Sequence, residues 1–175
     1  CVIMRGTPAF MLSLALGAAA SAEILINAAG ATFPYPIYSK WFDEFQKVRP
    51  GSQVNYQSVG SGAGIRVLQA GAVDFGASDC PITDQQASQL GIRVLHFPTV
   101  VGAVVPIYNI RGVTSALNFT PEALAKIQLG TVRRWNDPRI ASANPGAPLP
   151  SADIVPVHRS DGSGTTFIWT EYLSK

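Results

Sequence analysis

The sequence predicts an α/β fold built on mostly parallel strands. Short apolar runs alternate with longer segments whose apolar residues recur every three or four positions, which is the pattern of strands alternating with helices. The 175 residues suffice for one ordinary domain or two small lobes. With 47% hydrophobic and only 14% charged residues, the chain can bury a core, which argues against a disordered protein.

Strands and helices are expected to alternate through the first half of the chain. The first helix places Tyr38, Phe42 and Phe45 on one apolar face, and Arg49-Pro50-Gly51 ends it. We expect strands at residues 23–28, 53–58 and 73–77, and helices at residues 34–48, 63–70 and 84–90.

The second half begins with two apolar runs, which we interpret as the passage from one lobe into another. Thr120-Pro121-Glu122 opens a helix with a capping hydroxyl, a proline at the first helical position and an acid in the first turn. We expect a helix from Thr120 to Gly130, a strand at residues 154–158 and a helix at residues 165–173. Residues 23–98 then form the first lobe, and residues 99–175 the start of the second.

The first 22 residues have the pattern of a secretory signal peptide. A basic start at Met4-Arg5 precedes an apolar run over residues 9–18 and a small-x-small cleavage site, Ala20-Ser21-Ala22. A membrane anchor is the alternative, but this run is too short to span a bilayer. We therefore expect cleavage before Glu23 and export of the chain.

Three loops of small and hydroxyl residues each precede a predicted helix. The first turn of a helix has unpaired N–H groups and a partial positive charge, so it favours an anion. In parallel α/β sheets ligands bind beyond the carboxyl ends of the strands, where these loops are expected to lie. The loops are Ala31-Thr32-Phe33-Pro34, Gly60-Ser61-Gly62-Ala63-Gly64 and Asp161-Gly162-Ser163-Gly164-Thr165-Thr166.

Arg159 stands just before the third loop and can pair bidentately with an oxyanion. Asp161 is placed to orient its guanidinium, although an ordinary surface ion pair is the alternative. The glycine-rich second loop lacks the lysine of a P-loop and the spacing of a dinucleotide fingerprint, which argues against nucleotides. A net charge of +2 with scattered basic residues argues against nucleic acid. The loops together predict one tetrahedral anion held from several sides.

Asp79 indicates which anion. A carboxylate accepts a hydrogen bond from an anion that keeps a proton, as phosphate does. Sulfate would leave the carboxylate unsatisfied, at a cost of about 1–3 kcal/mol, or roughly 5- to 150-fold in affinity. The alternative is that Asp79 only caps the helix that follows Pro81.

Four motifs resemble the phosphate-binding protein of the ABC-type phosphate importer (the PstS family), and the resemblance runs from about residue 26 to the end. It implies a periplasmic binding protein-like two-lobe fold, and a monomeric periplasmic receptor that binds inorganic phosphate and delivers it to a membrane permease, without a cofactor. The motifs are Gly30-Ala31-Thr32-Phe33-Pro34, Val73-Asp74-Phe75-Gly76-Ala77-Ser78-Asp79, Phe97-Pro98-Thr99-Val100 and Arg159-Ser160-Asp161-Gly162-Ser163-Gly164-Thr165.

The resemblance also implies a set of phosphate ligands. Asp79 would accept the phosphate proton, Arg159 would supply the positive partner, and Asp161 would support it. The full set of expected phosphate-binding residues is Thr32, Phe33, Ser61, Asp79, Arg159, Ser163, Gly164 and Thr165.

Two rival hypotheses remain. One is a phosphatase-like enzyme on the same frame, for which His158, Asp161 and Ser163 are the candidates, but they lack the G-x-S-x-G elbow. The other is a fragment without function of its own: family members continue beyond the position of Lys175, and three residues precede Met4, so we expect a partial sequence. We expect no enzymatic activity.

Overall fold

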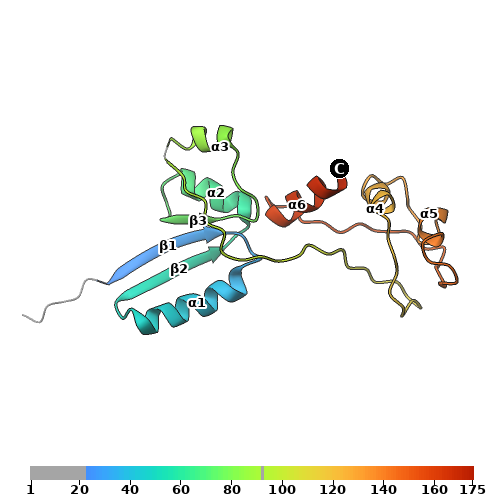
Figure 1. Cartoon of the computed structure of the whole chain (residues 1–175), viewed down its shortest axis with the longest axis horizontal. Coiled ribbons are helices and arrows are strands. Elements are labelled where there is room, and N and C mark those ends of the chain that lie inside the picture. Colours follow the sequence, from blue (N-terminus) through green and yellow to red (C-terminus); the bar gives the residue numbers. More distant parts are fainter. Residues whose placement is uncertain (1–22, 92) are drawn as a thin grey trace, which may run out of the picture.

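A three-stranded parallel sheet forms the centre of the first half of the chain (Figure 1). The computed structural model describes residues 23–91 and 93–175, so the predicted signal peptide lies outside the described residues. Strand order is β2-β1-β3, with β1 at Ile24–Gly30, β2 at Ser52–Ser58 and β3 at Phe75–Ala77. Both pairings are parallel, so the predicted parallel α/β sheet is confirmed.

Helices cover both faces of this sheet. Figure 1 shows α1 (Tyr35–Val48) on one face, and α2 (Ser61–Gln69) and α3 (Asp84–Gln89) on the other. In α2, Gly64 packs so closely on β1 that an added methyl carbon would lie 2.5 Å from the Cα of Gly30. This approach sets the N-terminus of α2 directly beside the carboxyl end of the sheet.

The described residues contain two separate hydrophobic clusters. The first lies between α1 and the sheet and contains Ala31, Tyr38 and Ala77. The second contains Ile127, Val132 and Ile140, and joins α4 (Pro121–Gln128) to the short helix α5 (Pro138–Ala141). The last helix, α6 (Gly164–Leu173), contacts α4. None of the described helices has the length and apolarity needed to cross a bilayer.

The predicted strand at residues 154–158 does not form. The segment makes one antiparallel bridge, between Asp153 and Arg134, and then continues as extended chain with the Val157 side chain 90% exposed. An alternating apolar pattern becomes a strand only where a neighbour supplies a ladder of hydrogen bonds. Among the described residues, no strand forms such a ladder with residues 154–158.

The sequence pattern does not predict helix α5, because the helix has only four residues. Its first residue is nevertheless preceded by a recognisable N-cap. Asp137 Oδ1 accepts the backbone N–H of Arg139, and Pro138 occupies the first helical turn.

An extended connection leaves the first half and is fixed to it at its start. The hydroxyl of Tyr38, on α1, lies 2.7 Å from the Thr99 hydroxyl, and Val100 packs on the first hydrophobic cluster. Tyr38→Phe keeps the ring but removes this hydrogen bond, so we expect the free energy of unfolding to fall by about 1 kcal/mol. Thermal denaturation of the two proteins measures the difference, and an unchanged melting temperature would contradict it.

Candidate functional site

The three predicted loops meet at one place, beside the carboxyl end of the sheet. Arg159 Nη1 donates to Thr32 Oγ1 at 2.9 Å, which joins the third loop to the first. The Gly62 N–H donates to the Gly162 carbonyl at 2.8 Å, which joins the third loop to the second. Figure 1 shows the start of α6 close to α2. We call residues 31–34, 60–64, 79 and 159–166 the loop cluster.

The first loop is held by the end of β3 and by a tyrosine from β2. The Ala31 N–H donates to the Ala77 carbonyl at 2.9 Å, and the Tyr56 hydroxyl donates to the Ala31 carbonyl at 2.7 Å. Burial raises the pKa of Tyr56, so its hydroxyl stays protonated and able to donate. The sequence gives no signal for this contact of Tyr56, because an aromatic residue in a strand indicates only a place in the core.

The second loop turns directly into α2. The N–H groups of Val59 and Gly60 both donate to the Gly30 carbonyl, and Gly60 adopts a φ of 89°, which suits glycine. Ser61 begins α2 with only 3% of its surface exposed. Its hydroxyl oxygen accepts the backbone N–H of Asp79 at 3.2 Å, so it ties the second loop to the segment after β3.

The third loop ends in a capped helix start. Ser163 is the N-cap of α6, and its hydroxyl oxygen accepts the Thr166 N–H at 3.2 Å. A hydroxyl that accepts still has a proton to donate. Gly164 is buried against Ser61 and Asp79, so close that an added methyl carbon would lie 2.5 Å from Ser61 Oγ.

Arg159 and Asp161 form a two-point ion pair. Arg159 Nε donates to Asp161 Oδ1 at 2.8 Å, and Nη2 pairs with Oδ2. The hydrogen bond from Arg159 lowers the pKa of the Asp161 carboxyl, and the same bond raises the pKa of Arg159. Because Asp161 occupies one edge of the guanidinium, the group is oriented with Nη1 toward Thr32.

Asp79 lies inside the loop cluster. One of its carboxylate oxygens accepts the Thr165 hydroxyl at 2.8 Å, across 86 positions of sequence. Helix α3 is capped by Thr83, whose hydroxyl accepts the Gln86 N–H while the Gln86 side chain accepts the Thr83 N–H. The alternative that Asp79 serves only as the cap of that helix is therefore wrong.

Phe33 is the one predicted residue whose side chain is directed elsewhere. Its backbone belongs to the first loop, but the ring packs on the connection, where a methyl carbon on Gly102 would lie 2.4 Å from two ring atoms. The other seven predicted ligands and the supporting Asp161 are held in the cluster through the contacts described above.

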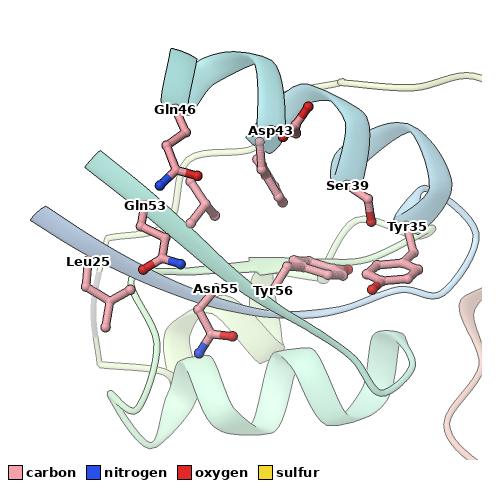
Figure 2. A pocket seen from close by; sticks show the side chains of 10 residues that line it. Leu25, Tyr35, Ser39, Asp43, Gln46, Gln53, Asn55 and Tyr56 are labelled. Atoms are coloured by element: carbon pink, nitrogen blue, oxygen red, sulfur yellow. The ribbon is translucent and has the colours of Figure 1, made fainter. Parts of the chain in front are cut away.

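A hollow of about 570 Å³ lies between α1 and the outer strand β2 (Figure 2), and no residue of the loop cluster lines it. It contains none of the predicted ligands, and its apolar floor includes Phe42 and Tyr56 of the first hydrophobic cluster. Its lining residues are Leu25, Tyr35, Ser39, Phe42, Asp43, Gln46, Gln53, Val54, Asn55 and Tyr56.

Comparison with known families agrees with the α/β fold of the chain. The family model of the PBP superfamily domain matches residues 17–175. The chain belongs to this superfamily.

Among curated proteins, the chain is similar to the phosphate-binding protein PstS of Pasteurella multocida. They are 50% identical over 151 residues, which cover 86% of this chain and 43% of that protein. It is also similar to PstS of Methanocaldococcus jannaschii, at 40% identity over 86% of this chain and 40% of that protein. The chain thus spans less than half the length of these relatives.

Solved structures show the same fold. A phosphate ABC transporter substrate-binding protein from Clostridium perfringens, solved with bound phosphate, superposes with a TM-score of 0.63 at 19% identity, over 85% of this chain and 56% of that one. An ABC-type phosphate transport receptor from Vibrio cholerae gives a TM-score of 0.51 at 19% identity, over 86% of this chain and 55% of that one. The predicted periplasmic binding protein-like α/β fold is confirmed.

Proposed function

We propose that this chain is part of a periplasmic receptor for inorganic phosphate, which delivers its ligand to the permease of an ABC importer. The proposal depends mainly on one observation. Arg159 and Asp79 both form hydrogen bonds within the loop cluster, so a positive group and a carboxylate lie at the same site. The names of the relatives, phosphate-binding protein PstS, support the same ligand. A guanidinium suits the charge of phosphate, and a carboxylate suits the proton that phosphate retains.

In this proposal, phosphate takes hydrogen bonds from all three loops. Thr32 and Phe33 donate from the first loop, and Ser61 donates from the second. Arg159, supported by Asp161, supplies the positive charge, and Asp79 accepts the phosphate proton. Ser163, Gly164 and Thr165 donate from the start of α6. In the present structure Arg159 contacts Thr32, and the Thr165 hydroxyl donates its one proton to Asp79. A hydrogen bond from that hydroxyl to phosphate would replace its contact with Asp79.

We propose further that residues 23–98 form the first lobe and residues 99–175 the start of the second, in a monomer exported by a cleaved signal peptide. The two separate hydrophobic clusters support this division. The proposed boundary lies next to Thr99, whose hydroxyl is 2.7 Å from the hydroxyl of Tyr38 on α1.

A binding role is also favoured over a catalytic one by the geometry of the enzyme candidates. Asp161 pairs with Arg159, the Ser163 hydroxyl caps α6, and His158 Nδ1 lies 3.1 Å from the carbonyl of Arg159. Each of these contacts joins a candidate to a partner outside the trio, and none of them links Ser163 to His158 as a nucleophile to its base.

Thermal denaturation with phosphate or sulfate tests the proposal. At a phosphate concentration 100 times Kd, linkage adds about 2.7 kcal/mol to stability, which for a chain of this size raises Tm by about 5–10 °C. We expect this rise with phosphate and little change with sulfate. No rise with phosphate, or an equal rise with both anions, would overturn the proposal.

Asp79→Asn is expected to reduce the ratio of phosphate affinity to sulfate affinity by roughly 5- to 150-fold. The amide can donate to a fully deprotonated anion, which the carboxylate cannot do. Asp153→Asn removes one negative charge from an exposed side chain outside the loop cluster and serves as the control. Affinity for the two anions is measured by calorimetry, and an unchanged ratio in Asp79→Asn would exclude the proposed role.

A further inference from the structure

The second and third loops touch through their backbones, without side chains between them. Gly62, in the first turn of α2, donates its N–H to the carbonyl of Gly162 at 2.8 Å. Gly162 immediately precedes Ser163, the N-cap of α6. This contact therefore joins the N-terminal ends of two helices that are far apart in sequence.

A larger residue at either position would require the backbone of the other loop to move. A methyl carbon on Gly62 would lie 3.0 Å from the Cα and 3.1 Å from the carbonyl oxygen of Gly162. A methyl carbon on Gly162 would lie 3.1 Å from the Cα of Gly62. All of these neighbours are backbone atoms, so a change of rotamer cannot relieve the overlap. Neither glycine has a positive φ, so alanine is compatible with the local backbone at both positions.

We propose that Gly62 and Gly162 are positioning residues that set the spacing between the α2 and α6 N-termini around the anion. The inference rests on the proposed phosphate site. Ser61 lies next to Gly62, and Ser163 and Gly164 follow Gly162, so a shift at the glycine contact moves proposed ligands on both sides. Hydrogen bonds to the anion need donor–acceptor distances near 2.7–3.2 Å. A separation of a few tenths of an ångström therefore weakens donors from two loops at once.

The second loop also passes close to the ion pair of Arg159 and Asp161. At Gly60, two residues before Gly62, a methyl carbon would lie 2.7 Å from Asp161 Oδ2 and 3.1 Å from Arg159 Nη2. At Gly60 the backbone alone therefore fills the space beside the ion pair. These two glycines of the loop thus allow close contacts at the site in addition to forming a turn.

The test compares Gly62→Ala, Gly162→Ala and the double variant with the parent 175-residue chain. Calorimetry gives the Kd for inorganic phosphate, and thermal denaturation without phosphate gives the stability of each unliganded protein. We expect each single variant to bind phosphate at least about tenfold more weakly. This loss of binding free energy should exceed the loss in stability of the unliganded protein. Both methyl groups act on one contact, so the double variant should lose less than the product of the two single effects.

Ser151→Thr is the matched control, because it adds one methyl group to an exposed side chain outside the loop cluster. It should bind phosphate as the parent does. If the parent binds phosphate and both glycine variants bind it equally well, the positioning role is wrong while the phosphate site stands. Loss of affinity matched by an equal loss of unliganded stability would also refute it. If the parent itself does not bind phosphate, the proposed function fails, and the positioning role fails with it.

Discussion

Arg159→Ala is expected to weaken phosphate binding by about two orders of magnitude. Hydrogen bonds to a charged group contribute roughly 1.5–3 kcal/mol, which corresponds to about 10- to 150-fold in affinity. The loss should reach the upper part of this range, because removing the guanidinium also leaves the Asp161 carboxylate beside the anion without its partner. Calorimetric titration with phosphate measures the effect.

Two further variants separate the geometry of Arg159 from its charge. Arg159→Lys keeps the charge but has a single ammonium that cannot serve Asp161, Thr32 and phosphate together, so its affinity should fall between those of parent and alanine variant. Arg133→Ala removes the same charge at a position outside the loop cluster, where the side chain donates to the Gly130 carbonyl. Equal losses in Arg133→Ala and Arg159→Ala would show that only net charge matters.

Gly64→Ala is expected to destabilise the fold, although alanine is the better helix former. In an ordinary helix interior this substitution stabilises by about 1 kcal/mol. Here the new methyl carbon would lie 2.5 Å from the Gly30 Cα and 2.9 Å from the Ala29 carbonyl oxygen, and α2 would have to move away from the sheet. We expect a net loss of about 1–3 kcal/mol, seen as a lower midpoint in urea denaturation.

The neighbouring position provides the control for Gly64. Ala63→Gly reverses the substitution one residue earlier in α2, and helix propensity alone predicts a loss of about 1 kcal/mol. If close packing on the sheet determines the effect at Gly64, then Gly64→Ala and Ala63→Gly both lower the free energy of unfolding, although they are opposite substitutions. A higher midpoint for Gly64→Ala would show that propensity dominates and that α2 tolerates displacement from the sheet.

Local signals accounted for most of the helices and for the parallel sheet. Helix α4 begins as predicted because Thr120 accepts the Ala123 N–H and Pro121 occupies the first turn, and both signals are local. Residues 154–158 form no strand because pairing depends on distant residues. The periodicity of a sequence indicates which face of a strand or helix is apolar. It does not indicate which segment of the chain pairs with that strand or packs on that face.

The three loops were predictable from the same local signals, whereas the proposed set of ligands rests on the resemblance to the PstS family. The mutual arrangement of the loops was not predictable, because the contacts of Arg159 with Thr32 and of Thr165 with Asp79 cross more than 80 positions. The close approach of Gly62 and Gly162 likewise depends on how two distant helices are placed. In sequence these glycines belonged to predicted anion-binding loops, but nothing indicated their contact with each other.

The proposed function requires that the loop cluster forms one site for a protonated tetrahedral anion. Calorimetric titration of the 175-residue chain with phosphate, and then with sulfate at the same ionic strength, measures this preference. We expect one phosphate bound per chain and affinity for sulfate lower by at least about fivefold. Equal affinity for the two anions, or no binding of phosphate, would contradict it.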